Sequence, residues 1–260
     1  MRILMAFIFL PFFQQVQSQP AFQLAAPLLK YQSAFFSGST LLEVNFNQPG
    51  SMVHFTLNGN EPTETDPEYL SPIKISKATV VKVKAFSNDF LPSETVSVHF
   101  MQDGKAISQM EFSTPDKSYT SSNPAMLYDN IGGITNLKSG TWLGYKSDTV
   151  TITIQLKKKE KLKTILVDLL QDEGSWIFAP EHGFVYCYDE KSAAFVLSGE
   201  HINKQQIPSP KQTVMLDIPI NPTFKTNQLK LVLVPFNKIP DWHNGKGNHS
   251  WLFIDEIKVY

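Results

Sequence analysis

The chain has 260 residues, of which 42% are hydrophobic and 18% are charged, and its formal net charge is −1. This composition is typical of a globular protein with enough apolar surface for two modest cores or one large core. A nearly neutral chain lacks the basic footprint of a nucleic-acid-binding protein, so we expect no nucleic-acid partner.

The N-terminus has the pattern of an export signal. Arg2 is a short positive region, residues 3–13 are apolar, and Val16 and Ser18 supply small residues before a cleavage point. The apolar run falls short of the roughly 20 residues that span a bilayer. We therefore predict a signal peptide over residues 1–18, cleaved after Ser18, and no transmembrane segment in the mature protein. That protein is expected to be secreted, periplasmic or at the cell surface; the alternative is an N-terminal anchor.

Residues 19–103 are predicted to form a small antiparallel β-sandwich of the immunoglobulin or fibronectin kind. The runs LLEVNF, MVHFTL, TVVKVKAF and TVSVHF alternate apolar and polar residues over strand length. Gly, Pro, Asn or Asp bounds each run, and residues 40–101 show no sustained helical period. The polar, turn-rich residues 102–125 place a domain boundary near residues 103–105.

Residues 104–260 are predicted to form a second β-sandwich, of jelly-roll type. Seven further runs have strand character, and ISQMEFS is a shorter candidate: TVTITIQL, LKTILVDLL, FVYCYD, AAFVLSG, TVMLDIPI, LKLVLVPF and WLFIDEIKVY. The lysine-rich residues 157–163 are interpreted as a solvated hairpin turn. Cys187 is the one cysteine, so no intramolecular disulfide can form, and we expect it to be a half-buried strand thiol.

Two family resemblances follow from these residues. The segment GSMVHFTLNGNEPT and its continuation to residue 100 resemble the C-terminal module of chitobiase and β-hexosaminidase proteins, with Asn58-Gly59 as a turn. LYDNIGGI, WLGY, LLQDEGSWIFAP and WHNGKGNHSWLFIDEI, all within residues 126–260, resemble discoidin-like (coagulation factor type C) sandwiches. These accompany the first module in secreted glycosidases, but the glycosidase catalytic barrel has no counterpart in this chain.

The resemblance implies an exported, non-catalytic protein whose second module binds a glycan or glycoconjugate of amino-sugar or galactose type. No nucleophile elbow is present, and the acid pairs 172–173 and 255–256 are strand neighbours that point to opposite faces. The alternatives are a structural or protein-interaction module with a partner at the cell surface, or an accessory piece of a separate glycosidase.

The four tryptophans suggest where a sugar would bind. Trp251 and Trp142 are expected in the core, and Trp176 is either rim or core. Trp242 lies in the most polar loop and is expected to be an exposed platform, with a lid on the sandwich as the alternative. His243, Asn244 and Asp241 offer it donors and acceptors, and Asp172 accompanies Trp176 in the turn QDEGS. These six residues are the predicted ligand site.

A structural calcium ion is the cofactor that the discoidin resemblance implies. Asp129 and Glu256 match its acidic ligands, because carboxylate and carbonyl oxygens suit calcium. Simple alternation puts Asp255 on one face with Phe253, Ile257 and Val259, where it needs a hydrogen-bond partner or a cation. Asp255 is therefore a further metal candidate, and a β-bulge would exchange the two acids. His243 and His249 share a loop without a recognised zinc spacing.

Overall fold

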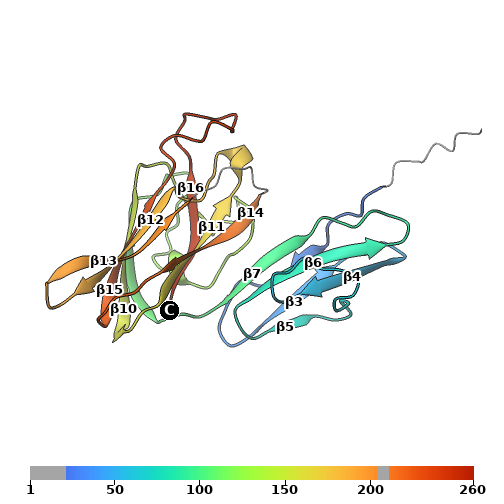
Figure 1. Cartoon of the computed structure of the whole chain (residues 1–260), viewed down its shortest axis with the longest axis horizontal. Helices are drawn as coiled ribbons and strands as arrows, with labels where there is room; N and C mark the ends of the chain where they lie inside the picture. Colours follow the sequence, from blue (N-terminus) through green and yellow to red (C-terminus); the bar gives the residue numbers. More distant parts are fainter. Residues whose placement is uncertain (1–21, 204–210) are drawn as a thin grey trace, which may run out of the picture.

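The computed structural model describes residues 22–203 and 211–260, so the predicted signal peptide and its cleavage site lie outside the described residues. The described residues are all-β apart from two 3-10 turns, η1 (Met126–Tyr128) and η2 (Glu173–Ser175). None of their helices has the length and apolar character needed to cross a bilayer. Two β units lie side by side, which confirms the predicted fold class (Figure 1).

The first module packs two sheets around one core. The three-stranded sheet has the order β1 (Leu28–Lys30), β3 (Thr40–Asn45), β5 (Ile73–Ile75); the four-stranded sheet has the order β2 (Phe35–Phe36), β7 (Val96–Gln102), β6 (Thr79–Ser87), β4 (Ser51–Thr56). On β6, alternate residues Val81, Val83 and Ala85 are fully buried, as the period of a half-buried strand requires. All four runs predicted over residues 40–101 are strands.

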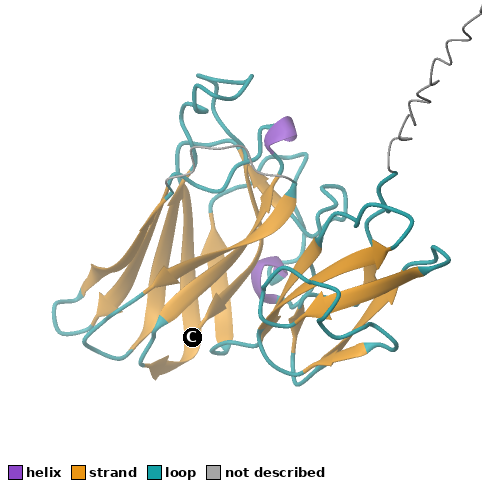
Figure 2. Cartoon of the chain, turned by 45° about the vertical axis from the view of Figure 1, so that its right-hand side comes forward, coloured by secondary structure: helices purple, strands orange, loops and turns teal. Residues whose placement is uncertain are grey.

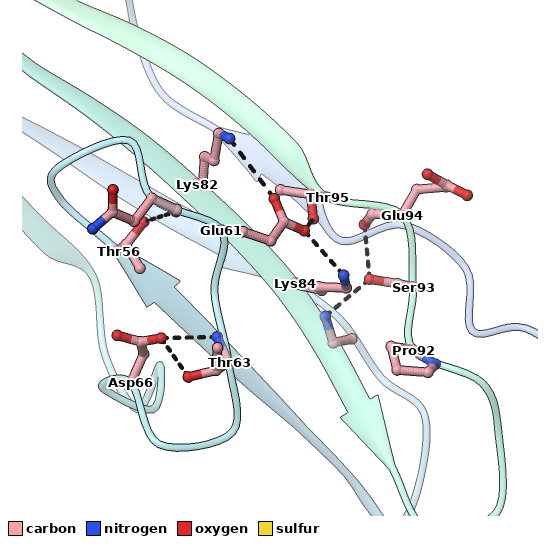
Figure 3. Close-up of polar contacts among 12 residues, drawn as sticks. Thr56, Glu61, Thr63, Asp66, Lys82, Lys84, Pro92, Ser93, Glu94 and Thr95 are labelled. Atoms are coloured by element: carbon pink, nitrogen blue, oxygen red, sulfur yellow. Dashed lines mark hydrogen bonds and ion pairs between the residues drawn. The ribbon is translucent and has the colours of Figure 1, made fainter.

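The motif FTLNGNEPT forms a turn that side chains fasten to the sheet (Figure 3). Gly59 has a positive φ of 79°, as expected for a turn glycine. Glu61 pairs with Lys84 at 3.0 Å and also accepts a hydrogen bond from Thr95. The Thr95 hydroxyl and the lysines hold the pKa of Glu61 below its usual value. The motif residues therefore hold the module's own fold together.

The second module is a sandwich of one five-stranded and one four-stranded sheet. The five-stranded sheet has the order β13 (Ala194–Ile202), β12 (His182–Asp189), β15 (Thr226–Val234), β10 (Val150–Glu160), β8 (Ile107–Phe112). The four-stranded sheet has the order β14 (Gln212–Pro219), β11 (Thr164–Gln171), β16 (Leu252–Val259), β9 (Leu143–Tyr145). Inward residues of both sheets form one core, which includes Ile152, Ile165 and Leu231. All seven predicted runs are strands, and ISQMEFS contains β8.

Two local predictions need correction. Residues 157–163 are not a hairpin turn, because Lys157–Lys159 continue strand β10 and the chain then crosses to the other sheet. Cys187 is fully rather than half buried, since it faces the core from the inner side of β12. Burial raises the pKa of its thiol, which keeps it unreactive.

The two modules contact each other through the turn that follows η1. The Tyr31 hydroxyl donates to the Gly133 carbonyl at 3.0 Å, and the Ala34 amide donates to the Gly132 carbonyl at 3.3 Å. Lys258 of the last strand lies 5.7 Å from the ring centre of Phe35. In Figure 2, η1 is the lower of the two purple turns and lies where the modules meet. The outer face of the four-stranded sheet is thus turned toward the first module.

Candidate functional site

Two loops meet at one end of the second module: residues 172–178, which contain η2, and residues 239–248. We call them the tryptophan loops. The Nε2 atom of His243 lies 3.0 Å from the carbonyl oxygen of Glu173, 70 residues earlier. The indole of Trp176 lies against Gly245, where a Cβ atom would come within 2.9 Å of the ring. The two predicted parts of the ligand site are therefore neighbours in space.

His243 joins the two tryptophan loops through both of its ring nitrogens. Its Nδ1 atom accepts a hydrogen bond from the Gly245 amide at 2.9 Å, so the proton is on Nε2 and is donated to Glu173. Turn bonds inside the loop, such as Gly247 N–H to the Ile239 carbonyl at 3.0 Å, hold its backbone. The loop is thereby preorganised.

Trp242 is half buried and packs on a small apolar cluster beneath the loops. Its ring centre lies 6.2 Å from that of Phe178, and Phe236 and Ile239 complete the cluster. Its Nε1 atom is buried and has no hydrogen-bond partner among the described residues. The ring therefore combines the two expected roles: one part covers the cluster, and the rest forms surface.

The remaining predicted ligand residues differ in accessibility. Asp241 and Asn244 are exposed beside Trp242, and Trp176 is half buried with a left-handed backbone (φ 63°). The carboxylate of Asp172 is mostly covered, because its Oδ2 atom lies 3.0 Å from Lys211 Nζ and accepts a bond from Ser175. No sequence motif marks Lys211, whose ammonium group reaches Asp172 just before η2.

The other two tryptophans lie where they were expected. Trp142 is buried, and its Nε1 atom donates to the Ile134 carbonyl at 3.2 Å. Trp251 is half buried and packs with Tyr119 and Phe253 in the same apolar cluster as Trp142. The Trp142 indole is buried, and Lys146 lies 5.5 Å from the ring centre of Trp251, so the tryptophan loops hold the two candidate rings.

The three metal candidates lie near a β-bulge in strand β16. Val167 pairs with Ile257 and Leu169 pairs with Ile254, so Asp255 and Glu256 together oppose the single residue Asp168. The predicted alternation across this strand is therefore wrong: Leu252, Ile254, Ile257 and Val259 face the core, whereas Phe253 packs on the opposite side. We call Asp168, Asp255, Glu256 and Lys258 the bulge cluster.

Each acid of the bulge cluster is buried, and the partners differ. The Oδ2 atom of Asp255 accepts a hydrogen bond from the Gly133 amide at 2.7 Å, which is a partner of the kind expected for a buried acid. Glu256 accepts one from Lys258 at 2.7 Å. Burial raises the pKa of Asp255 to about 8 and that of Glu256 to about 7. Burial and the two neighbouring acids raise the pKa of Asp168 well above its usual value.

Calcium binding stays a prediction, and the side chains as they lie do not fit it. The described residues contain no group of three acids, histidines or cysteines placed to hold one metal ion. The Lys258 ammonium bonds to both Glu256 and Asn130, and so occupies the position of a cation beside that carboxylate. The Asp129 carboxylate accepts bonds from Asn123 and Ile131.

The described residues contain no catalytic barrel, and their paired acids are poorly placed for glycoside hydrolysis. Asp255 and Glu256 are at most 1% exposed, so neither can reach a sugar in solvent. Glu173 is buried, and Asp172 is paired with Lys211. A glycosidase needs two accessible carboxyl groups on opposite sides of the scissile bond.

Comparison with known families identifies the first module. Residues 32–97 match the chitobiase/beta-hexosaminidase C-terminal domain. This match covers the segment that resembles that family in sequence, including FTLNGNEPT, and so confirms that resemblance. No curated protein sequence matches the chain.

Among solved structures, the chain is similar to carbohydrate-binding modules and to a fucosidase. One is the family 32 carbohydrate-binding module from Streptococcus pneumoniae EndoD (13% identity, 61% of this chain and 96% of that chain, TM-score 0.38). Another is CBM32-1 from a family 31 glycoside hydrolase of Clostridium perfringens (14%, 60% and 96%, 0.37). The chain covers only 24% of the Ruminococcus gnavus GH29 fucosidase solved with fucose (12%, 58% of this chain, 0.33).

Proposed function

We propose that this protein is an exported, non-catalytic carbohydrate-binding protein whose second module binds a glycan through the tryptophan loops. The export signal at residues 1–18 supports the location, and the discoidin resemblance of residues 126–260 supports an amino-sugar or galactose-type ligand. The first module spaces and supports the second.

The observation that carries the proposal is the convergence of Trp176 and Trp242 at one end of the sandwich. Both indoles are half buried, so each has a fixed orientation and still presents an edge or face to solvent. Exposed Asp241 and Asn244 lie beside them and supply an acceptor carboxylate and an amide. A rigid apolar ring flanked by polar groups suits a sugar, which has apolar C–H faces and polar hydroxyl edges.

A glycan array probed with the wild-type protein tests the proposal, followed by titration of the best ligand against Trp242→Ala. We expect binding that weakens about tenfold or more, the equivalent of about 1.4 kcal/mol, on loss of the ring. Phe22→Ala is the matched control, because Phe22 is an exposed aromatic residue of the first module. An array without binding at high protein concentration would refute the function. Unchanged binding by Trp242→Ala would refute the site.

A further inference from the structure

The outer face of the five-stranded sheet carries an unexpected row of rings. On β12, alternate residues Val185 and Cys187 face the core, so His182, Phe184, Tyr186 and Tyr188 point outward. The solvent face of an antiparallel sheet is ordinarily polar. Here, four successive outward positions of one strand are aromatic or imidazole rings, about 7 Å apart along the strand.

Neighbouring strands widen this row into a surface. Tyr188 pairs with Phe195 and Tyr186 with Leu197 on β13, and the Tyr188 and Phe195 rings meet edge to face at 5.3 Å. Leu197 and Ile202 are about half exposed, at 49% and 51%. In Figure 1 the sheet lies on the side of the sandwich away from the first module. Exposed apolar patches of this kind mark binding surfaces.

The other border of the row is polar. Across β15 and β10, the same register places Lys230 beside Tyr186, Thr153 beside Lys230, and Gln155 beside Gln228. Lys230 Nζ lies 5.0 Å from the ring centres of both Tyr186 and Phe195. Among the described residues, neither the Thr153 hydroxyl nor the side-chain amide of Gln228 has a hydrogen-bond partner, whereas the Gln228 backbone amide donates to Thr226. Rings along one strand are thus flanked by hydrogen-bonding groups along the next.

We propose that this sheet face is a second carbohydrate-binding surface, distinct from the tryptophan loops, for an extended neutral polysaccharide that runs along β12. The proposal rests on the proposed function in taking carbohydrate as the ligand class. A line of rings matches successive sugar residues, whose C–H faces stack on aromatic faces. Lys230, Thr153 and Gln228 then bond to hydroxyl groups along one edge of the polysaccharide.

The central lysine favours a glycan over a protein on this face. Cores of protein interfaces are depleted of lysine. A symmetric dimer through this face would have to desolvate both Lys230 and the exposed Glu200, which lies opposite Phe184 on β13, and burying two charges is costly even where they pair. A hydrated polysaccharide leaves the ammonium in contact with water and hydroxyl groups.

Affinity electrophoresis of the full chain in gels containing a neutral β-glucan, xylan or galactomannan tests the proposal. We expect at least one polysaccharide to retard the wild type, and Tyr186→Ala and Tyr188→Ala each to weaken that retention about tenfold. Leu197→Ser is a second, milder variant at an exposed position, and it should weaken retention too. Phe22→Ala is the control that should behave as wild type. Circular dichroism confirms that each variant is folded.

Tryptophan fluorescence separates the two surfaces, since Trp176 and Trp242 lie in the loops and no tryptophan lies in the five-stranded sheet. Polysaccharide bound on the sheet leaves the emission unchanged, and Trp242→Ala leaves its retention unchanged. Retention abolished by Trp242→Ala but not by Tyr186→Ala would overturn this proposal and leave the proposed function standing. The reverse pattern, retention lost in Tyr186→Ala and kept in Trp242→Ala, is the result expected for two distinct surfaces. The absence of retention in every gel would also overturn the sheet proposal. A dimer seen by sedimentation and abolished by Tyr186→Ala would overturn it too, because the face would then be a protein interface.

Discussion

Substitution of Gly132 by alanine tests whether the turn after η1 is built around the Asp255 carboxylate. Gly132 has a φ of 142°, and a Cβ atom there would lie 1.8 Å from Asp255 Oδ2. That oxygen already accepts the Gly133 amide bond in a fully buried position. The added methyl group must therefore displace either the carboxylate or the turn, and both movements break the bond between them.

The expected destabilisation has three parts. Backbone strain costs about 1–3 kcal/mol, overpacking about 1–3 kcal/mol, and an unpaired buried carboxyl about 1–3 kcal/mol. These three costs overlap, because a single movement of the turn or of the carboxylate relieves part of the strain and part of the clash. We therefore expect the free energy of unfolding to fall by about 4 kcal/mol in total. Gly140→Ala is the matched control: its φ is 82°, but its Cβ would meet nothing within 4 Å. It should lose only about 1–2 kcal/mol.

Urea unfolding followed by tryptophan fluorescence is the assay. All four tryptophans, at positions 142, 176, 242 and 251, belong to the second module, so the signal reports on the module that contains the turn. If the free energies of unfolding of Gly132→Ala and Gly140→Ala differ by less than about 1 kcal/mol, the turn accommodates the added methyl group at little energetic cost. The carboxylate would then not be what fixes its shape.

Four further predictions concern the same region. Because Asp255 and Glu256 have pKa values raised to about 8 and about 7, these two groups bind more protons in the folded chain than in the unfolded chain between about pH 4 and pH 8. The free energy of unfolding should then fall as pH rises to about 8, and a urea titration showing a rise would contradict this. Lys258→Met leaves Glu256 without its counter-charge and should cost about 3–5 kcal/mol. A chelator should leave the melting temperature of the wild-type protein unchanged, and Ca²⁺ should raise the melting temperature of Lys258→Met. A wild-type melting temperature that falls when the chelator is added would favour the calcium site instead. Gly133→Ala places a Cβ atom 2.3 Å from the Cβ atom of Ala34 in the first module, so the two modules should separate. Small-angle X-ray scattering should then show a more extended protein. An unchanged scattering profile would refute the contact between the modules.

Strand positions followed from the sequence because alternation is a local property. Every run chosen for its period-two pattern is a strand, from LLEVNF in the first module to WLFIDEIKVY in the second. The strands that were not predicted are β1, β2, β5 and β9, which have only two or three residues. A pattern of period two cannot be recognised over such a length, and pairing with longer strands defines these segments.

The bulge in β16 shows where local reasoning stops. WLFIDEIKVY contains no glycine or proline to mark an extra residue, so the sequence predicts uniform alternation and leaves a bulge only as the alternative. Asp255 and Glu256 instead share the place opposite Asp168, which moves Ile257 and Val259 to the core side. A partner strand imposed this change. The positions of the two metal candidates on this strand, Asp255 and Glu256, therefore depend on its pairing with β11. Asp168 of β11 lies 87 residues before Asp255 in the sequence.

Alternation predicts which face of a strand a residue occupies, but not what covers that face. On β11, the outward residues Leu166, Asp168 and Leu170 are buried like the core. The first module and the turn after η1 lie on this side of the sandwich, and Leu170 packs with Trp142, Ile177 and Phe253. On β12, the outward residues Phe184 and Tyr186 face away from the first module and stay partly exposed. The outward residues of β11 and β12 have similar apolar character. The first module packs on the β11 side of the sandwich, so only the β12 side stays accessible to solvent. The aromatic sheet face is therefore a consequence of where the first module packs, and a sequence pattern alone could not separate it from buried core.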